Sequence, residues 1–299
     1  MPSSVLLLGA TGGIGALIAG QLSSHRHQFD RVAFLTAIAD AGPEKEAKYK
    51  AVPLPRIVGA LDDPASYNGF DIVVSSVNDL EGAQIRYIDA AFAGGIKHFY
   101  PAEFGMDLTR PEIQEESFFA RKLNIRKHLE HVVSQDPSRG FTYILVGMWS
   151  NWMLDFNIFG LSDDKKSATF VGAPDTLLTT THAEDVASVT VLSLLPSHLK
   201  SLSERRHIRL AGSTLTISQY YSVLSKVLGH DINVQYVSKE ASYSEAEDPK
   251  EKSNHLAIIL ASLKRTLGFG GSVLEGVDND SYPEITVKSW EEVVKARFS

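Results

Sequence analysis

Residues 5–15 constrain the fold of this chain more than any other stretch. They read Val-Leu-Leu-Leu-Gly-Ala-Thr-Gly-Gly-Ile-Gly, so that four apolar residues run directly into glycines spaced three apart. Apolar residues at helical spacing follow, at positions 14, 17, 18 and 22. The pattern predicts a buried strand, a tight turn and the start of a helix. A strand that is apolar on both faces belongs in the middle of a parallel sheet.

The glycine-rich turn predicts a binding site for an anion. Glycines let the backbone turn sharply and approach a ligand, and a helix N-terminus presents N–H groups and the positive end of its dipole. In this arrangement the anion is a dinucleotide pyrophosphate. The alternative is a glycine-rich bend without a ligand, but the position of the turn, between a strand and a helix, favours the binding site. The residues expected to bind the cofactor here are Gly9, Thr11, Gly12, Gly13, Ile14 and Gly15.

Composition excludes several classes of protein. The chain has 299 residues, of which 43% are hydrophobic and 22% charged, as in soluble globular proteins. Its net charge of −7, without a long basic run, argues against nucleic-acid binding. The absence of cysteine excludes disulfides, thiolate zinc sites and cysteine nucleophiles. No apolar run approaches the roughly 18 residues of a membrane span. We therefore expect a cytoplasmic protein with no membrane partner.

Further strand patterns alternate with helical ones through the first half of the chain. They cover residues 31–36, 56–58, 71–77, 97–100 and 141–146. This alternation predicts an α/β fold, a Rossmann-type doubly wound parallel sheet with a smaller C-terminal α/β substrate domain. The NAD(P)-binding domain is expected at residues 1–155, with returning segments at about 177–212. Residues 156–299 are expected to form mainly the substrate-binding or lid domain.

The end of the second predicted strand bears on cofactor preference. An acid at this position binds the ribose hydroxyls of NAD, and an arginine accommodates the 2′-phosphate of NADP. Here the strand ends in Thr36, with neither, and lysines follow at positions 45, 48 and 50. Lys45 can meet a 2′-phosphate, although a solvated helix face is the alternative, and we expect NADP rather than NAD. After the fourth strand, Ser76, Val77 and Asn78 are expected to flank the nucleotide.

Residues 117–133 predict a helix with a lysine on its apolar stripe. The stripe consists of Phe118, Lys122, Ile125 and Leu129. A lysine in this position must extend to solvent, pair, or occupy a pocket that lowers its pKa. Short-chain dehydrogenases carry Tyr-x-x-x-Lys on this helix, but here phenylalanine occupies the tyrosine position and cannot transfer a proton. Any catalysis on this helix therefore falls to Lys122.

The strand at 141–146 ends in a soft and aromatic segment. Its residues, expected to line an apolar pocket beside a nicotinamide, are Gly147, Met148, Trp149, Trp152 and Met153. Plain core packing is the alternative, because tryptophan and methionine most often serve as core residues.

Residues 4–156 resemble the atypical short-chain dehydrogenases of the isoflavone reductase and phenylcoumaran benzylic ether reductase type, within the NmrA-like group. Four segments carry the resemblance: Gly-Ala-Thr-Gly-Gly-Ile-Gly at 9–15, Phe-Tyr-Pro-Ala-Glu-Phe-Gly at 99–105, Lys-Leu-Asn-Ile-Arg-Lys at 122–127 and Phe-Thr-Tyr-Ile at 141–144. The turn at 147–149 differs from the Asn-x-Phe of plant members, which points to a fungal or microbial protein.

The resemblance implies an NADPH-dependent reductase of an aromatic, phenolic or quinone-like small molecule of secondary metabolism. It implies that Lys122 is the catalytic acid/base or oxyanion stabiliser. It places Pro101, Glu103 and Phe104 beside the cofactor, with Phe104 also facing the substrate. In the family the C-terminal region closes over the substrate, so Leu256 and Leu260 are expected to touch it.

Two other functions remain open. NmrA-like sensors bind NAD(P) and a protein partner without turnover, but they lack the helix lysine. A non-redox isomerase or cyclase on the same fold is the second alternative. No metal site is expected, since His128 and His131 have no evident third ligand. The acidic stretch at 239–252 is expected to be exposed, and the protein to be a monomer or homodimer.

Overall fold

The computed structural model describes residues 3–37, 42–77, 82–114, 116–246 and 255–298. In chain order the strands are β1 (Ser4–Leu8), β2 (Arg31–Thr36), β3 (Arg56–Val58), β4 (Ile72–Ser75), β5 (His98–Tyr100), β6 (Gly140–Leu145), β7 (Met148–Trp149), β8 (Ser167–Val171), β9 (Leu177–Thr181), β10 (Arg205–Arg209), β11 (Ser213–Thr216) and β12 (Asn233–Val237). The α-helices are α1 (Gly13–Ser24), α2 (Pro43–Ala51), α3 (Gln84–Ala93), α4 (Pro111–Gln114), α5 (Ala120–Ser134), α6 (Ser150–Asp155), α7 (Ala183–Leu192), α8 (Ile217–Leu228), α9 (Lys239–Ala246), α10 (His255–Gly268) and α11 (Trp290–Phe298). Four 3₁₀ turns complete the described elements: η1 (Arg26–Gln28), η2 (Pro64–Tyr67), η3 (Ser117–Phe119) and η4 (Asn279–Ser281).

A seven-stranded parallel sheet forms the larger part of the molecule, in the order β3-β2-β1-β4-β5-β6-β10. The strand β1 lies between β2 and β4, and Val5 to Leu8 are fully buried. The order reverses beside β1, which creates a crevice at the carboxyl ends of the strands. The predicted Rossmann-type doubly wound sheet is therefore confirmed.

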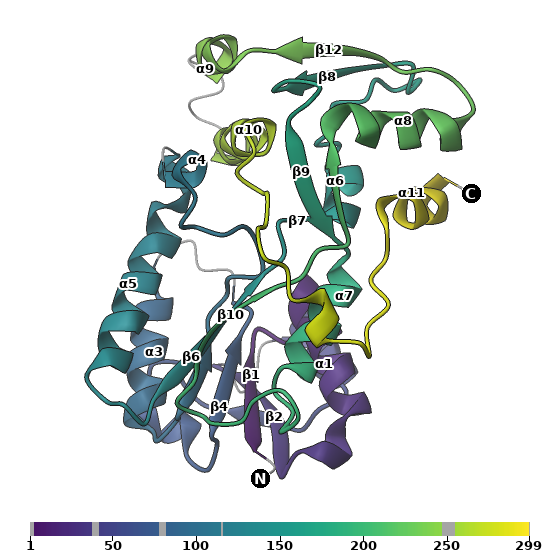
Figure 1. Cartoon of the computed structure of the whole chain (residues 1–299). Helices are drawn as coiled ribbons and strands as arrows, with labels where there is room; N and C mark the ends of the chain where they lie inside the picture. The colour runs from purple at the N-terminus through teal and green to yellow at the C-terminus, as the bar shows by residue number, and fades with distance from the viewer. Residues whose placement is uncertain (1–2, 38–41, 78–81, 115, 247–254, 299) are drawn as a thin grey trace.

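Alternate residues of β1 supply two separate hydrophobic cores. Val5 and Leu7 pack with α1 and α7 on one face of the sheet. Leu6 and Leu8 pack with α3 and α5 on the other face. Figure 1 shows these two helical layers on opposite sides of the strands. Because side chains alternate along a strand, an uninterrupted apolar run can serve both faces, and this is why residues 5–8 of β1 carry no polar side chain.

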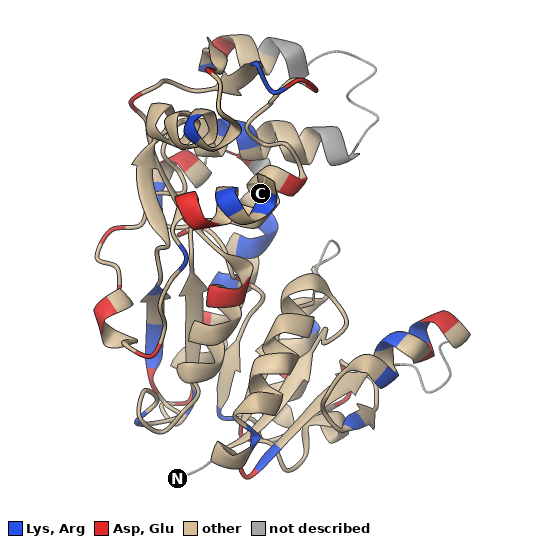
Figure 2. Cartoon of the chain, turned by 90° about the vertical axis from the view of Figure 1, so that its right-hand side faces the viewer, with Lys and Arg blue, Asp and Glu red and all other residues tan. Residues whose placement is uncertain are grey.

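A smaller layer, drawn mostly from the second half of the chain, lies above the carboxyl ends of the parallel strands (Figure 1). It contains a three-stranded sheet, β11-β9-β7, and a two-stranded sheet, β12-β8. A third core joins them around the rings of Phe159, Tyr220 and Trp290, with centroids 5.1–5.7 Å apart. Figure 2 shows acidic and basic residues interspersed over both parts. Within the described residues, every helix is too short or too polar to cross a bilayer.

The predicted domain boundary at residue 155 stays a prediction. Met106, Ile113 and Phe119, from the first 155 residues, pack into the third core. The returning segments contribute α7 and β10 to the larger layer and β9 to the smaller one.

Two polar segments of the chain are helical. The lysines after β2 lie on α2, where Pro43 occupies the first turn and acidic residues precede basic ones, which favours a helix. Residues 239–246 of the acidic stretch form α9, in which Glu240, Ala241 and Tyr243 are exposed and Ser242 is buried. Residues 247–252 lie outside the described residues.

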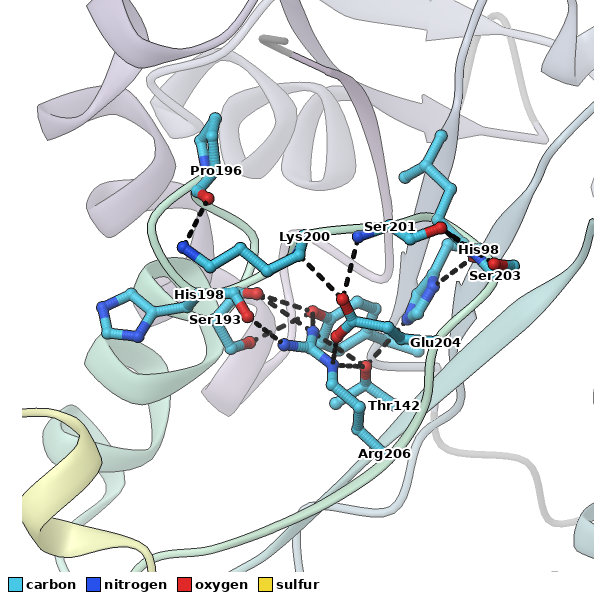
Figure 3. Close-up of polar contacts among 12 residues, drawn as sticks. His98, Thr142, Ser193, Pro196, His198, Lys200, Ser201, Ser203, Glu204 and Arg206 are labelled. Carbon is cyan, nitrogen blue, oxygen red and sulfur yellow. Dashed lines mark hydrogen bonds and ion pairs between the residues drawn. The ribbon is translucent and has the colours of Figure 1, made fainter.

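The edge strand β10 is fastened to the interior strands by a polar network around Arg206 (Figure 3). The Nε of Arg206 donates to the Thr142 hydroxyl at 3.1 Å, and Nη2 donates to the Tyr100 hydroxyl at 2.7 Å. Nη2 also donates to the Ser193 carbonyl at 3.0 Å, and Glu204 lies 3.6 Å from Nε. These hydrogen bonds and the nearby carboxylate compensate the charge of the largely buried Arg206 guanidinium.

The same network holds His98 neutral. Its Nδ1 donates to the Leu202 carbonyl at 2.8 Å, because a carbonyl can only accept, and its Nε2 accepts from the Thr142 hydroxyl at 2.8 Å. Burial lowers the pKa of His98 to about 3; the Arg206 charge also lowers it, against the effect of the Leu202 hydrogen bond. Protonation therefore favours the unfolded chain, where histidine titrates normally.

We predict that His98 makes the protein acid-sensitive. Neutral His98 contributes its full stability above the pKa that histidine has in the unfolded chain. This stability is lost as the pH falls from there toward the pKa of His98 in the folded chain. Between about pH 6.5 and 5, the free energy of unfolding should fall by about 2 kcal/mol through this group. In urea titrations, His98→Gln should be less stable at pH 7 and have a flatter acid limb. Exposed His27→Gln is the control, and equal slopes in wild type and His98→Gln would contradict the prediction.

Candidate active site

The glycine-rich turn connects β1 to α1 at the carboxyl edge of the sheet. Gly9 has a φ of +82°, and the Gly12 amide donates to its carbonyl at 3.0 Å. A Cβ on Gly15 would lie 2.1 Å from the Gly9 carbonyl oxygen, so Gly15 allows the helix to pack directly against the turn. Around Gly13, in contrast, a Cβ would meet nothing within 4 Å. This open side leaves room for a ligand at the helix N-terminus.

The start of α1 has no side-chain cap. Gly12 is the N-cap residue and makes no side-chain hydrogen bond. Thr11, Gly12 and Gly13 are exposed, whereas Ile14 packs into the core of the α1 face. The first-turn N–H groups are thus presented with the positive end of the helix dipole. This arrangement can bind a phosphate group.

A cavity of about 220 Å³ continues from the turn between the ends of β1, β2 and β4. Four of the predicted residues line it: Gly9, Thr11, Thr36 and Val77. The remaining lining residues are Ala10, Phe34, Leu35, Ala37, Tyr49, Leu61 and Tyr87. These come from separate segments with no shared spacing, so no sequence pattern could have assembled them. Their apolar and aromatic surfaces suit a nucleoside.

Two other described residues predicted to bind the nucleotide, Ser76 and Lys45, are not among the residues that line this cavity. The Ser76 hydroxyl donates to the Leu8 carbonyl at 2.7 Å and packs against the glycine turn. Lys45 is exposed on α2. Asn78 lies outside the described residues.

Lys122 lies on the first turn of α5, at the same edge of the sheet. Its side chain is half-buried, and Nζ donates to the backbone carbonyl of Glu103 at 2.8 Å. Burial lowers the pKa of the Lys122 amine; the Glu103 carboxylate opposes this effect and the Arg126 guanidinium adds to it. The lysine on the apolar stripe is therefore neither extended to solvent nor paired with a carboxylate. A lowered pKa makes an amine a better proton carrier near neutral pH.

A buried ion pair holds the loop that Lys122 contacts. Nε and Nη2 of Arg126 each donate to the Glu103 carboxylate at 3.1 Å, and the side chains are 5% and 3% exposed. Arg126 also lies 3.7 Å from Asp107 and 4.5 Å from the centre of the Tyr143 ring. The pair fixes the loop relative to α5. Arg126 belongs to the lysine-containing motif, but no sequence signal assigned it this contact.

The loop itself is strained at Phe104. This residue has a φ of +41°, which is unfavourable for a side chain of its size. Its carbonyl accepts from Trp149 Nε1 at 2.7 Å, and the neighbouring Gly105 carbonyl accepts from the Val146 amide at 2.7 Å. Pro101 is buried at the start of the loop. Such strain persists only where the surrounding contacts maintain it, and it is commonest at functional sites.

An aromatic series leads from this loop to the surface. The rings of Trp149 and Trp152 are 4.4 Å apart, and those of Trp152 and Phe156 are 5.4 Å apart. Trp149 is 8% exposed, Trp152 40% and Phe156 54%. Sequence reasoning missed Phe156, which follows α6, because the short helix was not predicted.

The remaining predicted substrate residues are not all brought to this surface. Gly147, with a φ of +66°, packs under the Thr179 carbonyl, and Met148 is buried in β7. Met153 is fully buried in the third core, and Leu260 packs against that core from α10. Nothing is described of the Leu256 side chain.

Comparison with known proteins adds a family. The model of the NmrA-like family matches residues 1–264. The isoflavone reductase homolog IRL of Zea mays is 27% identical, over 97% of this chain and 96% of that protein. A solved isoflavone reductase has a TM-score of 0.80 at 23% identity, covering 99% of this chain and 100% of that one. The leucoanthocyanidin reductase–NADPH complex from Vitis vinifera has a TM-score of 0.75 at 21% identity, covering 99% of each.

The structural likenesses show a shared fold, and the match to the family model shows which family the chain belongs to. It covers the glycine turn, the loop at 101–105 and the lysine helix in one alignment. The two relatives whose source is given are plant proteins, and a fungal or microbial origin for this chain stays a prediction. As expected from the four matching segments, the chain belongs to the NmrA-like family.

Proposed function

We propose that this protein is an NADPH-dependent reductase of an aromatic, phenolic or quinone-like small molecule. The position of Lys122 carries the proposal. Its half-buried amine is held by the Glu103 carbonyl at 2.8 Å, at the sheet edge that also carries the glycine turn. The next carbonyl along the same loop holds Trp149, the first ring of the aromatic series. A proton carrier and an aromatic surface thus share one loop.

The described residues fit a dinucleotide cofactor. The open side of the glycine turn suits the pyrophosphate, and the 220 Å³ cavity suits the adenosine half. A reductase of the same fold forms a complex with NADPH, which supports NADP as the cofactor. Bound nicotinamide would supply the hydride. The residues proposed to hold the cofactor also include Pro101, Glu103 and Phe104, in the loop that the Lys122 amine contacts.

Lys122 would act on the substrate oxygen. An ammonium group carries three donors, of which one is engaged by the Glu103 carbonyl. It can stabilise the negative charge that develops on an oxygen when hydride is added, and it can deliver a proton to that oxygen. Phe118, half-buried in η3, has no transferable proton. The Lys122 amine would therefore carry out the proton transfer that a tyrosine performs in other short-chain dehydrogenases.

The exposed rings of Trp152 and Phe156 define the kind of substrate. They leave 40% and 54% of their area exposed, so a planar aromatic partner gains apolar contact and stacking energy by covering them. Met148, Leu256 and Leu260 remain proposed substrate contacts. A cytosolic location and a monomeric or homodimeric state also remain predictions.

Replacing Lys122 should separate chemistry from cofactor binding. We expect Lys122→Ala to bind NADPH with an affinity close to that of wild type, followed by nicotinamide fluorescence. Turnover of quinone or phenolic acceptors should fall by about 10²–10⁴-fold, the usual contribution of a general acid. Lys127→Ala, an exposed lysine on the same helix, is the matched control and should retain turnover.

The outcome also discriminates the other functions. NADPH binding by wild type without consumption in any acceptor screen would favour a sensor. Product formation without net NADPH oxidation, measured anaerobically, would favour an isomerase or cyclase. Failure to bind NADPH and NADH would overturn the reductase proposal.

Arg126 should set the pH dependence of turnover. Its charge lowers the pKa of Lys122, and its loss also leaves the buried Glu103 carboxylate unpaired, which favours a charged lysine. Both effects raise the lysine pKa, so Arg126→Gln should move the corresponding limb of the kcat/KM profile to higher pH. Arg126→Lys keeps the charge and should restore part of the shift. An unmoved limb in a folded Arg126→Gln protein would contradict this prediction.

A further inference from the structure

A charged pair lies beside the wall of the nucleotide cavity. Arg56, the first residue of β3, pairs in register with Phe34 of β2. Its side chain reaches toward the carboxyl end of that strand, where Nε donates to the Thr36 hydroxyl at 2.9 Å. The guanidinium carbon lies 4.2 Å from the centre of the Tyr49 ring. Because Thr36 and Tyr49 both line the cavity, the guanidinium contacts its wall directly.

The second member of the pair comes from α2. Nη1 of Arg56 donates to both carboxylate oxygens of Glu46, at 3.0 and 2.8 Å. The two side chains are 21% and 25% exposed, so water and ligands can reach them. Glu46 and Tyr49 are three residues apart on the helix, which places the carboxylate and the ring on neighbouring positions of one face. Hydrogen bonds therefore hold the ion pair in place beside the cavity, where a ligand can still reach it.

Its location matches one part of the cofactor. In this fold the residue that ends the second strand meets the adenosine ribose, and a nearby arginine accommodates a 2′-phosphate. Thr36 ends that strand, and the guanidinium bonded to its hydroxyl belongs to Arg56. A guanidinium binds phosphate with two parallel hydrogen bonds, whereas a carboxylate repels phosphate and accepts from a ribose hydroxyl.

We propose that Arg56 binds the 2′-phosphate of NADPH and that Glu46 competes with that phosphate for the guanidinium. The pair thereby determines the preference between NADPH and NADH. When a 2′-phosphate enters, Glu46 gives up Arg56 and turns to solvent; when a 2′-hydroxyl enters, the ion pair stays closed. The assignment rests on the proposed function, since it requires a bound dinucleotide. It places the specificity of this chain on β3 and α2 rather than on the tip of β2.

The experiment measures NADPH and NADH affinities of the same proteins by nicotinamide fluorescence. We expect Arg56→Met to weaken NADPH binding by about 10–100-fold, the usual loss for charge-assisted hydrogen bonds, with NADH affinity unchanged. Glu46→Gln should do the opposite and strengthen NADPH binding several-fold without strengthening NADH binding. The two variants thus move the affinity ratio in opposite directions, which a general loss of structure cannot do.

Two matched controls come from the same elements. Glu44→Gln neutralises a carboxylate on α2 that pairs with Lys48 instead, at 2.8 Å. Arg31→Met removes an exposed cation from the far end of β2, where it lies 4.1 Å from the centre of the Phe70 ring. Neither control should change the affinity ratio. Thermal melts establish that each variant is folded, and Glu46→Gln tests the proposal alone if Arg56→Met is not.

Two outcomes would overturn the assignment in different ways. Wild-type protein that binds both nucleotides, with a ratio that neither Arg56→Met nor Glu46→Gln changes, would remove Arg56 from the phosphate site and leave the reductase proposal standing. Wild-type protein that binds neither nucleotide would overturn both together.

Discussion

The buried ion pair between Glu103 and Arg126 is the interaction on which the candidate active site depends. It fixes a five-residue loop, 101–105, whose carbonyls hold the Lys122 amine and the Trp149 ring. A buried pair of this kind adds little net stability, but removing one partner costs about 3–5 kcal/mol because the other charge is left uncompensated. The geometry of the loop is therefore specified strongly, and with it the position of the proposed proton carrier.

The two ends of the site are built from different physics. At the nucleotide end, the structure relies on backbone conformation and close packing, as at Gly9 and Gly15. At the chemical end it relies on buried charge, and the strained Phe104 backbone is held by hydrogen bonds from its neighbours. In the proposed reductase, cofactor binding and proton transfer therefore depend on different residues. This division also explains how the lysine keeps a perturbed pKa without disturbing the glycine turn.

Local patterns predicted the regular elements where periodicity and packing agree. Residues 5–8 lack polar side chains because both faces of β1 are covered, and that is visible in the sequence. The position of Lys122 on an apolar stripe left open whether its amine reaches solvent, pairs or occupies a pocket, and it did not point to the Glu103 carbonyl that the amine meets. Short elements escaped detection: β7 has two residues and α6 has six, too few for a period to show. Phe156 was missed for this reason.

The sequence by itself determined the parallel sheet, the glycine turn and the place of Lys122 on its helix, because each depends on a run of neighbouring residues. Only the tertiary structure decided what these residues meet. The contact of Arg56 with Thr36 joins positions 20 residues apart, and that of Lys122 with Glu103 joins positions 19 apart. Hydrogen bonds and charge pairing act through space, so their partners are set by how strands and helices pack and not by spacing along the chain.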